Sequence, residues 1–148
     1  MHSTNSASLR DQIAPKLDSL ARCLGRIESK YPLSESVLRD NADTLDVVSL
    51  NLERAVQQCV DICMMVLAEQ NQRLPDSMAQ GFTALADLHV VAPGTAERMR
   101  KAVAFRNVAM HEYTRMDLEI VAAICTQHLG DFRAFAREVI AYADGDNA

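Results

Sequence analysis

The sequence predicts an all-α protein, a bundle of four main helices and one short helix. Apolar residues recur every three or four positions through most of the 148 residues, which is the period of an amphipathic helix. β-Branched residues do not alternate with polar ones, and only five glycines and four prolines interrupt the pattern. The composition, 49% hydrophobic and 24% charged, is that of an ordinary globular protein. We therefore expect one domain over residues 1–148, with residues 1–6 as a flexible tail.

Composition and charge also argue against several classes of protein. No run approaches the roughly 18 apolar residues that a membrane-spanning helix needs. The N-terminal segment MHSTNSASLRDQ lacks the apolar core of a signal peptide. We therefore expect a cytoplasmic protein without a membrane partner. The formal net charge of −5 indicates that the chain does not bind nucleic acid through bulk positive charge.

A first helix is predicted from an apolar stripe that ends at the first residue of the segment YPLSES. The stripe consists of Leu9, Ile13, Leu17, Leu20, Leu24, Ile27 and Tyr31. Pro15 lies inside the stripe and cannot donate a backbone hydrogen bond. The helix is therefore expected either to begin near Pro15 or to kink there.

The second helix has the most regular pattern and should be central in the bundle. One stripe consists of Leu45, Val48, Leu52, Ala55, Cys59, Ile62 and Val66, and a second runs beside it through Val56, Val60, Cys63 and Leu67. Two adjacent stripes form a face wider than one neighbouring helix can cover. Asp43 or Thr44 is the expected N-cap. The width of the apolar face also suggests contact with a second copy of the chain.

Two shorter patterns follow. A short helix is expected from Ser77 to Leu88, with Asp76 as its cap. The turn VVAPG then precedes a fourth helix with Thr95 as its expected cap. The apolar stripe of this fourth helix is Met99, Val103, Arg106 and Met110, so an arginine occupies an apolar position.

A last long helix is expected to begin after Asp117, a favourable N-cap residue. Its apolar stripe is Val121, Cys125, His128, Phe132, Phe135, Val139 and Tyr142. Gly130 lies inside this helix and would cost about 1 kcal/mol relative to alanine.

The cysteines allow a metal site but are better explained as core residues. Cys59 and Cys63 are four positions apart on a predicted helix, and His128 follows Cys125 by three positions. These pairs could bind zinc, but no CxxC motif accompanies them. Free cysteine is among the most frequently buried residue types, and we therefore expect no metal and no cofactor.

The segment RNVAMHEY, residues 106–113, concentrates the chemically capable side chains. Arg106 on an apolar face is costly unless a counter-charge or an anionic ligand meets it. One reading is a structural salt bridge to Asp46 or Asp61. Between Glu97 and Arg115, five basic side chains face two acidic ones, so the surroundings of the segment carry a net charge of +3.

Arg106, His111 and Tyr113 together suit phosphodiester chemistry. An imidazole can move a proton near neutral pH, and a guanidinium can hold phosphate oxygens as negative charge develops on them. On an ideal helix, however, residues five positions apart diverge by about 140°. Arg106 and His111 can share a site only if the helix breaks between them or if two copies of the chain face each other.

The segment resembles the R-x4-H-x-Y motif of the HepT family, within the HEPN superfamily of helical domains. The surrounding sequence is also similar: KAVAFRN leads into the motif, MDLEIV follows it, and LDVVSLNLERAVQQCVDIC resembles the long second helix of that family. The resemblance covers nearly the whole chain.

This resemblance implies a homodimeric bundle of four to five helices that acts as a metal-independent endoribonuclease on RNA. It implies the toxin of a toxin–antitoxin pair, silenced when a small nucleotidyltransferase antitoxin transfers AMP to a tyrosine. Carried over by residue, Arg106 and His111 are the catalytic pair, Asn107 is a supporting residue, and Tyr113 is both a supporting residue and the modification site.

Two other functions remain open. The chain could be a non-catalytic module that binds nucleotides or presents substrate to a nucleotidyltransferase, which its acidic charge favours. It could also be a purely structural helical dimer. Taken singly, His111 would be an ordinary histidine and Tyr113 an amphipathic anchor at a helix end.

Overall fold

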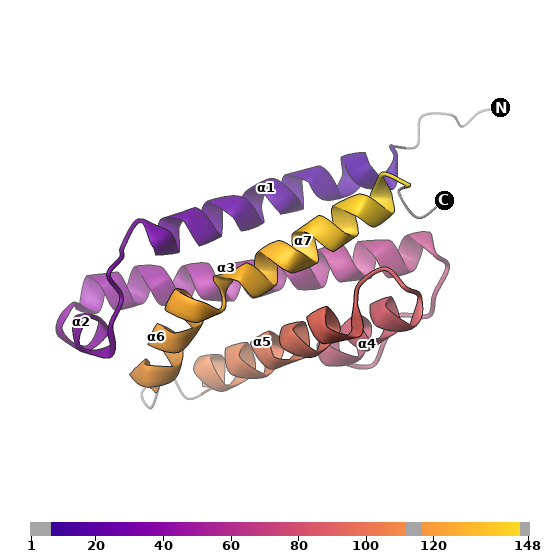
Figure 1. The fold of residues 1–148 in the computed structure, drawn as a ribbon. Helices are drawn as coiled ribbons and strands as arrows, with labels where there is room; N and C mark the ends of the chain where they lie inside the picture. The colour runs from indigo at the N-terminus through magenta and orange to yellow at the C-terminus, as the bar shows by residue number, and fades with distance from the viewer. Residues whose placement is uncertain (1–6, 112–116, 146–148) are drawn as a thin grey trace.

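The part of the chain that the structure describes consists of seven helices (Figure 1). The structure is a computed structural model; it describes residues 7–111 and 117–145, with the backbone alone at residues 108–111. The helices are α1 (Leu9–Glu28), α2 (Glu35–Asp40), α3 (Ala42–Glu69), α4 (Met78–Asp87), α5 (Pro93–His111), α6 (Leu118–Gln127) and α7 (Leu129–Ala143). No strand occurs in these ranges, and the predicted all-α class is confirmed.

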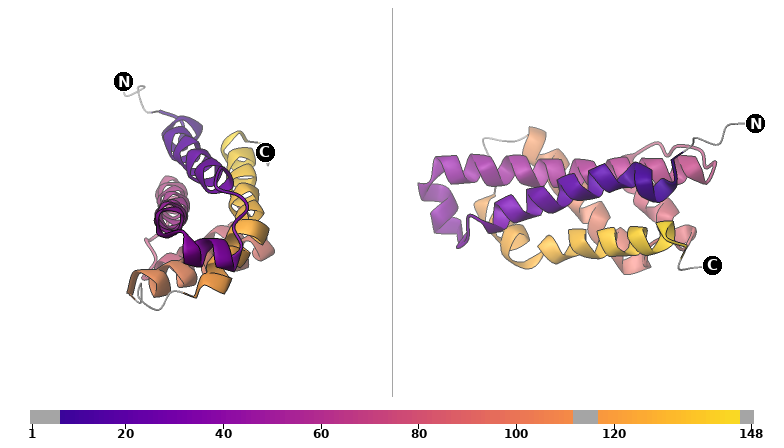
Figure 2. Two further views of the ribbon diagram at one scale, coloured as in Figure 1. Left: turned by 90° about the vertical axis from the view of Figure 1, so that its left-hand side faces the viewer. Right: turned by 90° about the horizontal axis from the view of Figure 1, so that it is seen from above.

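Helix α3 is the longest element and contacts α1, α4, α5 and α7, as predicted for a central helix. Figure 1 shows α1, α3, α5 and α7 as the long helices of the bundle, with α4 beside α5, and Figure 2 shows the same bundle end-on and from above. Both apolar stripes of α3 are buried from Val48 to Leu67 within one copy of the chain. The width of this face therefore does not by itself require a second copy.

The N-terminal helices differ from the prediction in their boundaries. Helix α1 begins at Leu9, where the Ser8 hydroxyl accepts a hydrogen bond from the Asp11 amide at 3.1 Å, and it continues through Pro15. A start near Pro15 was therefore wrong. Helix α2 was missed because six residues are too few to show a period, although Ser34 caps it in the usual way.

Three predicted caps were also wrong. Helix α3 follows Asn41 rather than Asp43 or Thr44, because Asn41 ends α2 by donating its side-chain amide to the Val37 carbonyl at 2.8 Å. Helix α4 is capped by Ser77 rather than Asp76, and α5 begins at Pro93, ahead of Thr95. Neighbouring polar residues offer equivalent caps in the sequence, so the sequence alone does not distinguish them.

The expected last long helix is two helices. The chain leaves helical geometry at His128, with φ −121° and ψ 4°, and Leu129 takes the buried position that was assigned to this histidine. The side chain of His128 is 52% exposed, so its predicted place on the buried stripe was wrong. Gly130 falls in the first turn of α7, where it does not interrupt a helix interior.

The buried apolar side chains form a single cluster that joins the helices. Within it, the rings of Phe82 on α4 and Phe135 on α7 pack edge to face, with centroids 5.6 Å apart and planes at 79°. No helix of the described ranges is both long and apolar enough to cross a bilayer. The expected cytoplasmic location remains a prediction, and the expected tail at residues 1–6 lies outside the described residues.

Candidate active site on helix α5

Helix α5 carries the motif, and its start is fixed by a carboxylate of α7. The Ala92 amide donates to Glu138 Oε1 at 2.7 Å, and the Thr95 hydroxyl donates to Glu138 Oε2 at 2.6 Å. Thr95 is 1% exposed, so this carboxylate satisfies a buried hydroxyl as well as a helix-terminal amide. Pro93 at the first helical position needs no acceptor for its nitrogen.

Arg106 lies at the edge of the buried face of α5. Met99 and Val103 are buried as predicted, whereas Arg106 is half-buried. Its Nη1 lies 3.6 Å from Sδ of Met78, the first residue of α4. Its Nε is buried and has no hydrogen-bond partner among the described residues. A buried donor without an acceptor costs about 1–3 kcal/mol, which is uncommon outside functional sites.

No carboxylate neutralises Arg106 within the described residues. Asp61, one of the two predicted partners, instead accepts hydrogen bonds from Lys16 at 2.9 Å and Gln57 at 2.7 Å. Asp46, the other candidate, forms no ion pair with Arg106. The structural salt bridge considered from the sequence is therefore absent from this part of the chain. Among the described residues, no carboxylate competes with an anion for this guanidinium.

The remaining motif residues are placed to different extents. Helix α5 continues without a break from Arg106 to His111, its last residue, and Asn107 is exposed on it. A break between the catalytic candidates, one of the two arrangements that would bring them together, is therefore ruled out. The side chain of His111 and the whole of Tyr113 lie outside the described residues. In a straight helix the two positions diverge by about 140°.

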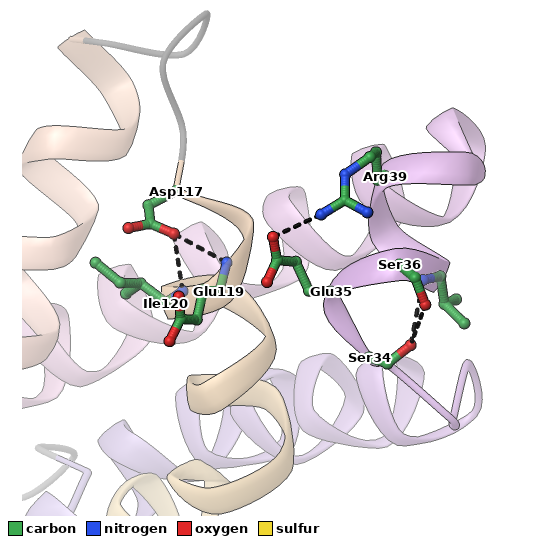
Figure 3. A network of polar contacts seen from close by, with 8 residues as sticks. Ser34, Glu35, Ser36, Arg39, Asp117, Glu119 and Ile120 are labelled. Atoms are coloured by element: carbon green, nitrogen blue, oxygen red, sulfur yellow. Dashed lines mark hydrogen bonds and ion pairs between the residues drawn. The ribbon is translucent and has the colours of Figure 1, made fainter.

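The chain re-enters the described structure at Asp117, which caps α6 as predicted. Its Oδ1 accepts hydrogen bonds from the Glu119 amide at 2.9 Å and the Ile120 amide at 3.4 Å (Figure 3). The same view shows the neighbouring helix α2, on which Arg39 and Glu35 form an ion pair at 2.6 Å. Helix α6 thus begins at a fixed cap and packs against α2.

A cavity of about 390 Å³ lies beside the motif helix, between α3, α5, α6 and α7. Its wall is largely apolar and includes Phe105, the neighbour of Arg106. At its rim, Asp131 pairs with both Arg98 and His128 at 3.2 Å. The periodicity of the sequence did not predict these contacts of Asp131, because they depend on the break between α6 and α7 at His128. The cavity adds a sheltered apolar surface to the side of α5 adjacent to Arg106.

The cysteines are core residues. Cys59, Cys63 and Cys125 are fully buried, and burial raises the thiol pKa of Cys63 and of Cys125 to about 12 and that of Cys59 further. Thiolate ligands are therefore costly at these positions. His128 points to the surface and Cys125 to the core, so the two do not form a common ligand pair. The described residues contain no group of three or more potential metal ligands.

The sequence matches the family model described as ribonuclease HepT-like over residues 20–139. One characterised relative is the mRNA nuclease HepT of Shewanella oneidensis. It is 32% identical over 127 residues, which span 86% of this chain and 95% of the relative.

Solved structures agree with this assignment. A tri-AMPylated HEPN toxin of Shewanella oneidensis in complex with an MNT antitoxin superimposes with a TM-score of 0.82 and 31% identity, over 88% of this chain and 98% of the toxin. A toxin–antitoxin structure with AMP-PNP gives a TM-score of 0.82 and 30% identity, with the same coverage. The cytosolic protein YutE of Bacillus subtilis, at 15% identity and a TM-score of 0.78 over 93% of this chain and 92% of its own, shares the fold.

Proposed function

The chain belongs to the HepT-like ribonuclease family, and on that premise we propose that it is a metal-independent endoribonuclease and the toxin of a toxin–antitoxin pair. One observation carries the proposal: Arg106, five positions before His111 on an unbroken helix, has no carboxylate partner among the described residues. A ribonuclease needs such an unpaired cation to hold a phosphodiester as charge builds on it. The single apolar core supports one HepT-like domain over residues 1–148.

In the proposed reaction the RNA 2′-hydroxyl attacks the adjacent phosphorus. The 2′-oxygen–phosphorus bond forms as the bond to the 5′-oxygen breaks, leaving a 2′,3′-cyclic phosphate and a 5′-hydroxyl. His111 handles a proton, since one leaves the attacking hydroxyl and one reaches the departing oxygen. Arg106 stabilises the crowded phosphorane through charge-assisted hydrogen bonds, and exposed Asn107 is a supporting contact to the RNA.

We propose further that two copies of the chain complete the site as a homodimer. The unbroken α5 supports this, because positions 106 and 111 of a straight helix lie about 140° apart around its axis. In an isologous contact, Arg106 of one copy can approach His111 of the other. Mixing Arg106→Ala with His111→Ala protein tests the arrangement: a mixed dimer would regain one intact site and with it part of the cleavage activity. No recovery after confirmed subunit exchange would mean that both residues act from the same copy.

The proposed partners are RNA and a nucleotidyltransferase antitoxin. The Shewanella oneidensis relative is named as an mRNA nuclease, and related toxin structures contain an antitoxin, one with the toxin AMPylated. Tyr113, two positions after the end of α5, is the proposed acceptor of AMP. The competing function is a non-catalytic binding module, which would bind nucleotide but leave RNA intact.

Cleavage of RNA by purified protein decides between these functions. We expect cleavage by the wild-type chain in EDTA, with a cyclic phosphate on the product, and loss of cleavage in His111→Ala and Arg106→Ala. Far-ultraviolet circular dichroism should show that both variants keep their helices. Equal cleavage by folded His111→Ala protein would contradict the catalytic role, and loss in EDTA that added metal restores would contradict a metal-independent mechanism.

A further inference from the structure

Met78 contacts the proposed catalytic arginine from a fixed position. It is the first residue of α4, where the Ser77 hydroxyl accepts the Gln80 amide at 3.2 Å, and it is 37% exposed. Its Sδ lies 3.6 Å from Nη1 of Arg106. Further along the same pair of helices, Arg100 Nη1 donates to Thr83 Oγ1 at 2.8 Å, which fixes their register. The Ser77 cap of α4 and the hydrogen bond between Arg100 and Thr83 therefore hold the Met78 sulfur beside the guanidinium.

A thioether acts on a guanidinium differently from a carboxylate. Sulfur is a weak, uncharged acceptor, so it can orient one N–H group without cancelling the positive charge. A carboxylate at the same place would form a charge-assisted, often bidentate pair and occupy the groups that a phosphate would use. An arginine has five N–H donors, and the thioether takes only one.

We propose that Met78 is a positioning residue that orients Arg106 toward an RNA phosphate while leaving its charge unpaired. The role rests on the proposed ribonuclease function. This positioning role requires a neutral side chain at position 78, because a negatively charged acceptor there would compete with the RNA phosphate for Arg106.

Two substitutions of similar shape separate charge from packing. Met78→Glu and Met78→Gln differ in charge but hardly in volume, so a purely structural role predicts similar losses. We expect kcat/KM for RNA cleavage to be at least about tenfold lower in Met78→Glu than in Met78→Gln, with much of the difference in KM. The charge-matched control is Gln80→Glu, an exposed position on the same helix, which should cleave like the wild type. Equal losses in the two Met78 variants would overturn the proposal.

A binding cycle tests whether Arg106 transmits the effect. Affinity for a 2′-O-methyl RNA, which cannot be cleaved, is measured by fluorescence anisotropy. The four proteins are the wild type, Met78→Glu, Arg106→Ala and the double variant. We expect Met78→Glu to weaken binding in the wild-type background and to have little effect once Arg106 is absent. An equal loss in both backgrounds would mean that the new charge repels RNA directly, which would also overturn the proposal.

A ligand-free measurement separates failure of this inference from failure of the proposed function. The Arg106 side-chain NMR signal should shift in Met78→Ala and stay unchanged in Gln80→Glu. An unchanged Arg106 signal in Met78→Ala would show that Met78 does not contact Arg106 in solution, and the inference would fail even if the wild type cleaves RNA. A wild-type chain that neither binds nor cleaves RNA would remove the proposed function, and the positioning role with it, even if the signal shifts.

Discussion

The Thr95 hydroxyl on α5 donates a 2.6 Å hydrogen bond to the Glu138 carboxylate on α7, and the same carboxylate accepts a 2.7 Å hydrogen bond from the Ala92 amide. The helix with the catalytic candidates is therefore fixed to the rest of the bundle at its first turn. The opposite end of α5 holds the motif. This arrangement separates a stabilising polar contact from the residues proposed for chemistry, so each can be tested without the other.

Replacing Glu138 by alanine should destabilise the fold without touching the motif. The buried Thr95 hydroxyl would lose its acceptor, at a cost of about 1–3 kcal/mol in the free energy of unfolding, measured in urea. Arg137→Ala, at an exposed neighbouring position, should have a small effect. Adding Thr95→Val to Glu138→Ala should recover part of the loss, because the unsatisfied hydroxyl is gone. No difference between Glu138→Ala and Arg137→Ala would show that the contact contributes nothing.

Gly81 marks a close approach between α4 and α3. A Cβ added there would lie 2.9 Å from Sγ of Cys63, which is fully buried. Alanine is favoured over glycine in a helix by about 1 kcal/mol, but overpacking costs about 1–3 kcal/mol. Gly81→Ala should therefore lower the free energy of unfolding, by up to about 2 kcal/mol.

The same substitution at Gly130 provides a matched control for Gly81→Ala. No atom lies within 4 Å of a Cβ built at Gly130, so Gly130→Ala should be neutral or stabilising by up to about 1 kcal/mol. In a Cys63→Ala background, Gly81→Ala should lose most of its cost, because the opposing sulfur is gone. If Gly81→Ala stabilised the otherwise wild-type protein, α3 and α4 would be shown to move apart enough for the added methyl group at little cost.

The ion pair between Glu28 and Arg133 should make stability depend on pH. Its two hydrogen bonds, 2.7 and 2.9 Å long, hold the pKa of Glu28 below its usual value of 4.5. A carboxylate with a lowered pKa contributes stability above its unfolded pKa and loses it as pH falls through the folded value. Both side chains are about 40% exposed, so solvent screening keeps the contribution at roughly 0.5 kcal/mol or less.

Glu28→Gln should therefore be slightly less stable than the wild type at pH 7, and the difference should shrink below about pH 4.5. Urea unfolding at a series of pH values measures it. In an Arg133→Gln background the pH-dependent part should disappear. If the stability difference between the wild type and Glu28→Gln instead grew as the pH fell, the pH dependence would belong to another group.

The long helices could be predicted because their apolar periods extend over many turns. Both stripes of α3 are buried from Val48 to Leu67, and only Leu45 at the start of the first stripe is not fully buried. The six-residue α2 offers too short a pattern, and the break at His128 follows a stripe that continues in register on both sides. Tertiary packing decided these points, and it left His128 at the surface with Leu129 in the core.

The candidate site was predictable only in part. The order of Arg106, Asn107, His111 and Tyr113 in the chain indicated the chemistry, but not which side chains surround the arginine. Contact with Met78 arises from the pairing of α4 with α5, across 28 positions of the sequence. No local pattern encodes such a contact. Of the two salt bridges suggested for Arg106, the one to Asp61 does not form, because Asp61 binds Lys16 and Gln57 instead.

Tyr113 is the remaining test of the toxin–antitoxin assignment. The tyrosine follows α5 by two positions, close in sequence to His111. AMP on its phenol would bring a bulky anion to the motif, where Arg106 has no carboxylate partner among the described residues. The phosphate can pair with the guanidinium, and the nucleoside would fill space that RNA needs. Modification and substrate binding should therefore exclude each other.

Co-expression with a nucleotidyltransferase encoded beside the gene should add one or more AMP units to the intact mass, with peptide mapping placing them on Tyr113. Tyr113→Phe should stay unmodified, whereas His111→Ala, which keeps the acceptor, should still be modified. Modified wild-type protein should lose RNA cleavage because the anion occupies Arg106. AMP on another residue, or undiminished cleavage by fully modified protein, would mean that Tyr113 is not the control point.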